Sequence, residues 1–243
     1  MIKPGLSYFE YASIIKNEKY ANQKLAIRDL TFQVTEDCNL KCSYCYQGNK
    51  THNKMNFATA KKFIDYLFEN KNNPDFFYNE ERTLGFVIEF IGGEPFLEVD
   101  LISEIIDYFE YKFLQYPDSS WLLYHAYNFS TNGTLYNTPK VQEFLKKYRE
   151  IIHMGITVDG NKQLHDSCRL FPDGSGSYNL AIEAALAELS NGYESTKITI
   201  SPNNVNFIFD GISNMISLGF KHININCCFE NLWDNESSIA LFH

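Results

Sequence analysis

Three cysteines that follow the first strand-like segment have the spacing of ligands for an iron–sulfur cluster. In the sequence TEDCNLKCSYCYQG, Cys38, Cys42 and Cys45 stand in a C-x3-C-x2-C arrangement. Thiolates are the usual ligands of iron–sulfur cubes, and three of them in one short loop can surround one cube. Because no fourth cysteine lies nearby, one iron would keep the open coordination position that is typical of catalytic metal sites.

The same three thiols are compatible with other chemistry. A zinc ion could take them as ligands if a distant side chain, such as His52 or Cys168, completed the site. They could also be unrelated thiols that share a loop by chance. The spacing alone favours iron–sulfur ligation over zinc, and the surrounding motifs strengthen that preference.

Two further motifs place ligand-binding groups directly after strand-like segments. In GFVIEFIGGEPFL, Gly92 and Gly93 allow backbone to approach a ligand closely, and exposed N–H and C=O groups there can pair with an ammonium group. In YNFSTNGTL, Ser130 and Asn132 supply a hydroxyl and an amide at the carboxyl end of a strand, where parallel sheets bind ligands. Taken alone, the first motif also fits a Gly-Gly turn that ends at Pro95, and the second fits an Asn-Gly turn.

The segments around these motifs alternate between strand-like and helix-like patterns. Strand candidates are rich in Phe, Val, Ile and Thr, and the stretches between them repeat apolar residues every three or four positions. Six strands, nearly all followed by a helix, predict a parallel sheet built from right-handed β-α-β units. The expected strands are Leu30–Thr35, Leu84–Ile91, Trp121–Ser130, Ile151–Val158, Thr196–Ser201 and His222–Cys227, the expected helices cover residues 57–67, 101–113, 138–148, 178–189 and 205–218, and a long loop is expected at residues 159–177.

Composition limits the class of protein. The chain has 243 residues, of which 44% are hydrophobic and 21% are charged, as expected for one large globular domain. A formal net charge of −9 argues against nucleic acid as the main partner, because phosphate binding normally needs a basic face. No apolar run approaches membrane-spanning length and no signal peptide is evident, so we expect no membrane partner and a cytoplasmic protein whose cysteines are thiols or metal ligands.

With these motifs in this order, the chain resembles the radical S-adenosylmethionine (SAM) superfamily. Its signature is C-x3-C-x-aromatic-C after the first strand, and Tyr44 occupies the aromatic position of the SAM-binding segment. The resemblance implies an α/β fold with a parallel sheet, a partial (β/α)6 TIM-like barrel. It also implies a [4Fe-4S] cluster and SAM as cofactors. The expected divisions are an N-terminal segment at residues 1–26, a radical SAM core at 27–229 and the truncated start of a C-terminal extension at 230–243.

The resemblance assigns roles to individual residues. The GGEP motif, which includes Glu94, is implied to bind the amino group of SAM, and the STNG motif is implied to lie in the same site. Thr157 stands where the family carries a residue that hydrogen-bonds the ribose of SAM. Arg169 closes an HDxxR segment whose arginine pairs with the SAM carboxylate, a planar partner that suits a guanidinium group.

Other polar and cysteine side chains in this region are expected to be structural. We expect Asp159 to order a loop, His165 to pack or to cap a helix, and Cys168 to be buried and inert. Cys227 and Cys228 close the last strand. Because adjacent side chains point to opposite faces of a strand, we expect these two cysteines not to share a metal ion.

The set CNLxCxYC, IGGEP, STNGT, TVDG and HDxxR is similar to the subgroup that contains peptide maturases and anaerobic sulfatase-maturating enzymes. Those proteins carry a C-terminal SPASM or twitch extension, and this sequence ends before one. The resemblance implies that SAM is cleaved reductively, with an electron from an external reductant of the flavodoxin or ferredoxin type. It implies that hydrogen is then abstracted from a peptide or protein substrate. The leading hypothesis is a maturase that forms a thioether or another side-chain crosslink in a ribosomally made peptide.

Two alternative functions stay open at this point. One is an anaerobic sulfatase-maturating enzyme, which oxidises Cys or Ser to formylglycine. The other is a non-catalytic iron–sulfur or zinc protein used for binding or redox sensing. The GGEP and HDxxR segments argue against the second alternative, because a structural metal site does not need a SAM pocket.

Overall fold

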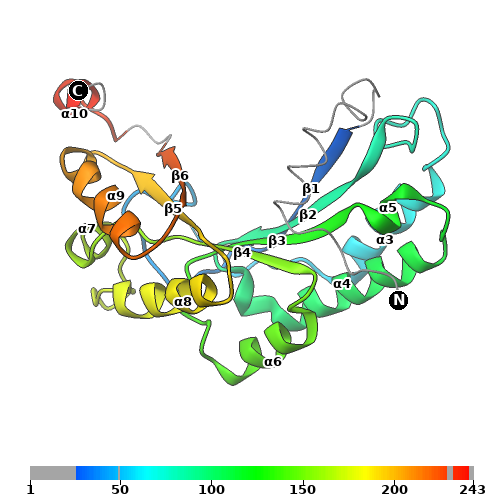
Figure 1. The fold of residues 1–243 in the computed structure, drawn as a ribbon, viewed down its shortest axis with the longest axis horizontal. Helices are drawn as coiled ribbons and strands as arrows, with labels where there is room; N and C mark the ends of the chain where they lie inside the picture. Colours follow the sequence, from blue (N-terminus) through cyan, green and yellow to red (C-terminus); the bar gives the residue numbers. More distant parts are fainter. Residues whose placement is uncertain (1–25, 49, 229–231, 241–243) are drawn as a thin grey trace.

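Six parallel strands form the framework of the protein. The computed structural model describes residues 26–48, 50–228 and 232–240. The first four strands pair in chain order, and the last two form a second parallel pair (Figure 1). The strands are β1 (Ala26–Thr35), β2 (Thr83–Gly92), β3 (His125–Thr131), β4 (Ile152–Ile156), β5 (Ser195–Ile200) and β6 (His222–Cys227).

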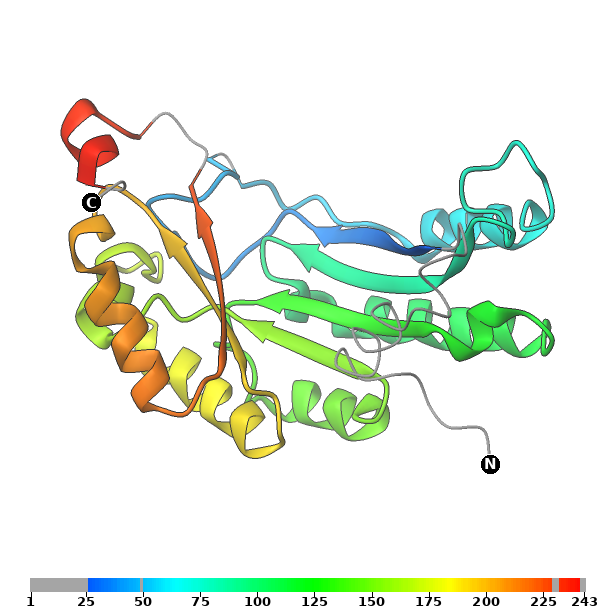
Figure 2. The ribbon, with the colours of Figure 1, turned by 45° about the horizontal axis from the view of Figure 1, so that its top comes forward.

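A parallel bridge connects the two sheets. Thr157 pairs with Lys197 of β5, and the backbone N–H of Val158 donates to the carbonyl of Lys197 at 2.9 Å. The strands therefore follow one another in a single curved series, with β1 and β6 as its edges (Figures 1 and 2). This arrangement confirms the predicted α/β fold with a partial barrel of parallel strands.

Helices cover the convex side of this curved sheet, because their apolar stripes need a partner. On α3 (Phe57–Glu69), the buried residues Ala60, Ile64 and Leu67 repeat at the spacing of one helix face. Asn56 caps the helix by accepting a backbone hydrogen bond at 2.9 Å. No helix in the described part of the chain has both the length and the apolar character needed to cross a membrane. The other large helices are α4 (Val99–Leu114), α6 (Pro139–Tyr148), α8 (Tyr178–Ser190) and α9 (Ile208–Ser217).

The two faces of the sheet differ in chemistry, as the alternation along β2 shows. Phe86, Ile88 and Phe90 are completely buried in the hydrophobic core. The ring of Phe90 lies 5.1–6.3 Å from three neighbouring aromatic rings, measured between centroids. Glu89 and Ile91, which alternate with these residues, are only half-buried and face a cavity. Because successive side chains of a strand point to opposite faces, polar groups of the strands collect on the concave face.

The predicted strand Trp121–Ser130 was too long at its start. Its first residues belong to a short helix, α5 (Ser120–Leu123). The hydroxyl of Ser119 caps this helix by accepting from the N–H of Trp121 at 3.3 Å. The buried indole of Trp121 donates to the carbonyl of Thr83 at 2.9 Å. Burial of Trp121 against β2 therefore outweighs the preference of an aromatic residue for a strand.

The loop predicted at residues 159–177 contains a helix, α7 (Lys162–Cys168). Asn161 caps it, because its side chain accepts from the N–H of Leu164 at 3.1 Å. Arg169 is the residue at which this helix ends. The HDxxR segment is thus a helical turn that carries its arginine to a fixed position.

The ends of the chain are described in part. Residues 1–25 of the predicted N-terminal segment lie outside the described residues. Beyond β6, the short helix α10 (Asn235–Ala240) lies in the range predicted as the start of an extension. Two 3-10 turns lie earlier in the chain, η1 (Pro95–Glu98) after β2 and η2 (Val205–Phe207) after β5. Trp233 donates its indole N–H to the carbonyl of Cys228 at 3.0 Å.

Replacing Trp121 by Phe should lower the free energy of unfolding by about 1–3 kcal/mol. The change removes a buried hydrogen-bond donor and leaves space in a packed core. Urea denaturation measures the effect. Leu123→Ala is the matched control in the same helix; its side chain is 55% exposed, and we expect a change below about 0.5 kcal/mol. Equal losses in the two variants would contradict the assignment of Trp121 to the core.

Candidate cofactor site

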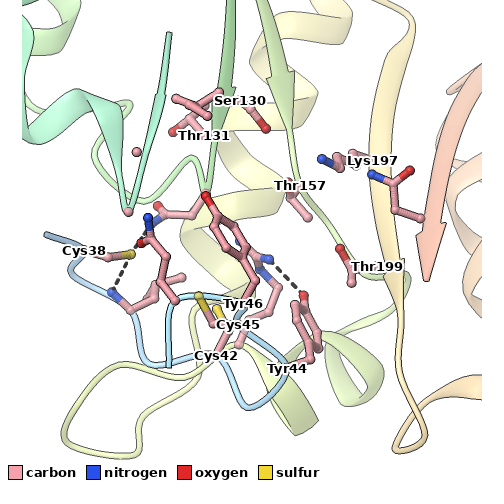
Figure 3. A pocket seen from close by; sticks show the side chains of 18 of the residues that line it. Cys38, Cys42, Tyr44, Cys45, Tyr46, Ser130, Thr131, Thr157, Lys197 and Thr199 are labelled. Atoms are coloured by element: carbon pink, nitrogen blue, oxygen red, sulfur yellow. Dashed lines mark hydrogen bonds between the residues drawn. The ribbon is translucent and has the colours of Figure 1, made fainter. Parts of the chain in front are cut away.

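A cavity of about 420 Å³ opens where the strands end on the concave face. Its volume is typical of a ligand site, for which about 300–1,000 Å³ is usual. The three cysteines lie on one side of the cavity, and Lys197 and Thr199 lie on the other (Figure 3). Of the predicted site residues, Glu94 lies outside the lining. Those that line the cavity are Cys38, Cys42, Tyr44, Cys45, Gly92, Gly93, Ser130, Asn132, Thr157 and Arg169.

The loop that carries the cysteines is fixed by backbone hydrogen bonds to the end of α7. The N–H of Lys41 donates to the carbonyl of Leu170 at 2.7 Å, and that of Ser43 donates to the carbonyl of Cys168 at 2.9 Å. Within the loop, a backbone N–H donates to the Sγ atom of Cys38 at 3.4 Å. Residues distant in sequence thus hold the thiols at the mouth of the barrel.

Gly92, the last residue of β2, and Gly93, which follows it, let the cysteine loop pack directly on the end of the strand. A Cβ atom on Gly93 would lie 2.1 Å from the carbonyl oxygen of Asp37 and 2.8 Å from the Cβ atom of Cys38. A Cβ atom on Gly92 would lie 2.6 Å from the carbonyl oxygen of Thr35. The sequence motif predicts that a ligand approaches the backbone closely at these glycines. In the structure, the space that a Cβ atom would need is occupied by the backbone of Thr35 and Asp37, next to the cysteines.

Glu94 is completely buried and connects the ends of two neighbouring strands. Its carboxylate accepts the hydroxyl of Thr131 at 2.6 Å, the N–H of Asn132 at 2.8 Å and the N–H of Phe96 at 3.1 Å. Burial raises the pKa of Glu94, and these three hydrogen bonds oppose the rise. Both carboxylate oxygens are therefore engaged within the protein.

The side chain of Asn132 links the end of β3 to the cysteine loop. Its amide oxygen accepts the N–H and the hydroxyl of Thr134 at 2.9 and 2.7 Å. Its amide nitrogen donates to the side-chain oxygen of Asn39 at 2.9 Å and to the Sγ atom of Cys38 at 3.9 Å. Every polar atom of this side chain has a protein partner, and both donors point at the cysteine loop.

Behind the cysteines, Arg169, Tyr44 and Asp159 form a buried network. The hydroxyl of Tyr44 donates to the carboxylate of Asp159 and accepts from Nη1 of Arg169 at 2.9 Å. Asp159 also accepts from the N–H of Thr199 at 2.8 Å. Burial raises the pKa of Tyr44 and that of Asp159, while the charge of Arg169 opposes both shifts. The buried Nε atom of Arg169 has no hydrogen-bond partner among the described residues, so the guanidinium keeps a free donor.

His165 supports this network in its neutral form. Its Nδ1 atom accepts from the N–H of Asp159 at 3.2 Å, so the proton lies on Nε2, 3.0 Å from the hydroxyl oxygen of Ser177. That hydroxyl donates to the carbonyl of Arg169 at 2.7 Å. Burial, with the nearby charges of Arg169 and Lys162, lowers the pKa of His165 to about 2. The expected packed role of this histidine is confirmed.

Several cavity residues were missed by sequence reasoning. Glu89 was the most visible of them, because it interrupts the apolar run FVIEFI of a buried strand. Lys197, Thr199 and Asn226 lie on the last two strands, where alternation alone does not tell which face meets the cavity. Gln47 and Lys50 lie in the cysteine loop, and Thr131 ends β3. The missed polar residues that line the cavity include Glu89, Lys197, Thr199 and Asn226.

The remaining cysteines occupy different surroundings. Cys168 is buried, as predicted, and lies in a small cluster with Tyr44 and Cys228. Cys227 and Cys228 both line the cavity. Cys228 is buried in the cluster with Tyr44 and Cys168, whereas Cys227 is only half-buried.

The thiols and the free arginine donor fit a cluster and SAM. No group of three or more His, Cys, Asp or Glu side chains in the described residues is placed to hold a single metal ion. A zinc site needs its ligands about 2.0–2.3 Å from one point, whereas each thiolate of a cube binds a different iron. His52 and Cys168, the suggested fourth zinc ligands, do not line the cavity. The free Nε donor of Arg169 suits a carboxylate such as that of SAM.

The chain belongs to the family of 4Fe-4S single cluster domains, whose model matches residues 27–182. Together with its relatives, this match places it in the radical SAM superfamily, beside peptide maturases and anaerobic sulfatase-maturating enzymes. A 4Fe-4S cluster and SAM are the cofactors of that superfamily.

The similar proteins are longer than this chain. An uncharacterized protein of Methanocaldococcus jannaschii is 30% identical over 202 residues, which cover 82% of this chain and 62% of that protein. The antilisterial bacteriocin subtilosin biosynthesis protein AlbA of Bacillus subtilis is 32% identical over 57% of this chain and 26% of its own length. A cysteine-type anaerobic sulfatase-maturating enzyme of Clostridium novyi is 28% identical over 60% of this chain and 36% of its own length.

A solved structure shares the fold. Native anSMEcpe with bound AdoMet and Cp18Cys peptide superimposes with a TM-score of 0.67 at 19% sequence identity, over 87% of this chain and 54% of that chain. At this level of identity the match concerns the fold alone. It agrees with the curved parallel sheet described above.

Replacing Gly93 by Ala should prevent the cysteine loop from seating on β2. The added Cβ atom would collide with the backbone carbonyl of Asp37, which cannot move without shifting Cys38. We expect iron incorporation during anaerobic reconstitution to fall several-fold. Gly48→Ala is the control in the same loop, because its Cβ atom would meet nothing within 4 Å. Full iron content in the Gly93 variant would show that the close packing is not required.

The neutral state of His165 predicts a dependence of stability on pH. Its folded pKa lies below the unfolded value of about 6.5, so below that pH only the unfolded chain takes up the proton. This group should therefore lower the unfolding free energy by about 1.4 kcal/mol per pH unit as the pH falls. Urea denaturation between about pH 7 and about pH 5 should show a shallower slope for His165→Asn than for the unmodified protein. An unchanged slope would mean that the buried imidazole accepts a proton.

Proposed function

We propose that this chain holds a [4Fe-4S] cluster through Cys38, Cys42 and Cys45 and uses SAM to remove hydrogen from a peptide substrate. The observation that carries the proposal is the single cavity of about 420 Å³ shared by the three thiols and the polar strand ends. When bound there, the cluster would supply the electron for reductive cleavage of SAM, and SAM would supply the carbon radical that removes a hydrogen atom from the substrate.

The residues of the chain orient SAM in this proposal. Arg169 pairs with the SAM carboxylate, and Tyr44 holds the guanidinium in position through the 2.9 Å hydrogen bond. The hydroxyls of Thr157 and Ser130 face the cavity from neighbouring strands and are available to the ribose and amino groups of SAM. Glu94 and Asn132 act indirectly, because their polar atoms fix the strand ends and the cysteine loop.

The relatives favour a peptide as the substrate. One of them is named for the biosynthesis of a bacteriocin, and the structure that shares the fold contains a bound peptide. We infer a maturase of a ribosomally made peptide that forms a thioether or another side-chain crosslink. The electron would come from a carrier of the flavodoxin or ferredoxin type.

A second candidate is the oxidation of Cys or Ser to formylglycine. It is supported by the similarity to the cysteine-type sulfatase-maturating enzyme. Both reactions remove two hydrogen atoms from the substrate, but only formylglycine carries an aldehyde. Mass spectrometry before and after treatment with a hydrazide reagent therefore distinguishes the two products.

The central test uses anaerobically reconstituted protein, SAM and a strong reductant. We expect methionine and 5′-deoxyadenosine to form, and we expect neither product when Cys38, Cys42 or Cys45 is replaced by Ala. Stoichiometric zinc with no iron uptake would overturn the proposal, because the thiols would then serve a different metal.

Arg169→Lys should weaken SAM binding about tenfold. A lysine ammonium cannot reproduce the fork of a guanidinium, and a hydrogen bond to a charged group contributes about 1.5–3 kcal/mol. Equilibrium dialysis with cluster-loaded protein measures the dissociation constant. Lys140→Met, which removes an exposed cation from α6, is the control and should leave SAM affinity unchanged. Unaltered affinity in the Arg169 variant would show that another residue binds the carboxylate.

A further inference from the structure

The cavity contains charged side chains to which the proposed cofactor role gives no task. One of them, Lys50, donates to the carbonyl of Leu40 in the cysteine loop. Glu89 of β2 and Lys197 of β5 line the cavity as well. In the part of the chain that the structure describes, neither forms an ion pair within 4.0 Å, with the other or with any third group. Charged groups on the wall of a ligand site that lack an ion-pair partner are candidates for contact with the ligand.

Glu89 lies deeper in the barrel than the residues proposed to bind SAM. It precedes Gly92 by three positions, which corresponds to about 10 Å along the strand. Its neighbours in register are Thr31 on β1 and Asn128 on β3. The carboxylate therefore stands on the concave face below the cysteine loop, on the path that a substrate would occupy between the open side of the barrel and the strand ends.

The surroundings of Glu89 favour a positively charged partner. Its carboxylate accepts a hydrogen bond from the amide of Asn128, which is long at 3.4 Å. Burial raises the pKa of Glu89 and the charge of Asp29 raises it further, while Lys197 opposes the rise. A half-buried carboxylate beside a second carboxylate is unfavourable unless a cation compensates it. The acidic side of the cavity thus has the electrostatics of a cation site.

We propose that Glu89 is a recognition residue that binds a cationic side chain, a lysine or an arginine, of the peptide substrate. The proposal rests on the proposed peptide function and specifies the kind of peptide. Lys197, on the opposite wall, repels the same cation and so fixes the direction in which the peptide lies. Exposed Asp29 on the adjacent strand extends the acidic side toward the opening.

The test begins with an unbiased probe. Protein loaded with cluster and SAM is immobilised anaerobically and exposed to a displayed library of random twelve-residue peptides, and the retained sequences are compared with the starting library. We expect Lys and Arg to be enriched by the unmodified protein and not by Glu89→Gln. Glu104→Gln, which removes an exposed carboxylate from α4, is the control for non-specific attraction to the acidic surface and should leave the enrichment intact.

A double-mutant cycle then locates the contact. A retained peptide and its copy with norleucine in place of lysine are titrated against both proteins by fluorescence anisotropy. Norleucine should weaken binding to the unmodified protein about tenfold, which is about 1.4 kcal/mol, and should have little effect on Glu89→Gln. Iron content and SAM affinity of each variant verify that it is folded. Glu89→Asp, which keeps the charge, should still prefer the lysine peptide.

Each other outcome overturns the proposal. If basic peptides bind equally to the unmodified protein and to Glu89→Gln, the cation lies elsewhere on the surface. If SAM affinity falls in Glu89→Gln, Glu89 belongs to the cofactor site. If the retained peptides are neutral or acidic, the recognition by Glu89 fails while the peptide function stands. If a protein that binds SAM retains no peptide, the peptide function fails as well.

Discussion

The packing of the cysteine loop on the ends of β2 and β3 is the contact on which the rest of the site depends. A loop with three cysteines has no fixed shape of its own, because ordering each residue costs about 1–2 kcal/mol of conformational entropy. Here that cost is offset by the close approach at Gly93, the amide contacts of Asn132 and the carboxylate of Glu94, which joins the two strand ends. The strands thereby fix the loop that carries the thiols.

A second constraint comes from the buried charges behind the loop. Arg169 and Asp159 are both withdrawn from water, and removing either would leave the other uncompensated. Tyr44 stands between them and hydrogen-bonds both, and His165 stays neutral so that it adds no further charge. These hydrogen bonds fix Arg169 at the end of α7, at the wall of the cavity. The buried Nε atom of its guanidinium has no partner among the described residues.

The sequence predicts the chemistry of the site where that chemistry follows from which residue types come directly after parallel strands. Cys38, Cys42, Cys45 and Arg169 reach one cavity because the carboxyl ends of such strands meet at one edge. The orientation of individual side chains was not predictable. Glu94 turns into the protein because three donors converge on it. The helical start of the predicted third strand depends on the hydrogen bond from Trp121 to Thr83, a long-range contact that local propensity does not contain.

In the function proposed above, the curvature of the sheet connects cofactor binding with substrate selection. Since β1 and β6 do not pair with each other in the described chain, the sheet is not closed into a full barrel, and Glu89 and Ile91 of β2 line the cavity on its concave face. Residues at the strand ends hold the thiols, and residues a few positions earlier on the same strands meet whatever enters from the open side. A rigid strand fixes the separation between these two levels. The backbone of β2 would then set the distance between the cofactors and the bound peptide. The carboxylate of Glu89 would select which part of the peptide lies close enough to lose a hydrogen atom.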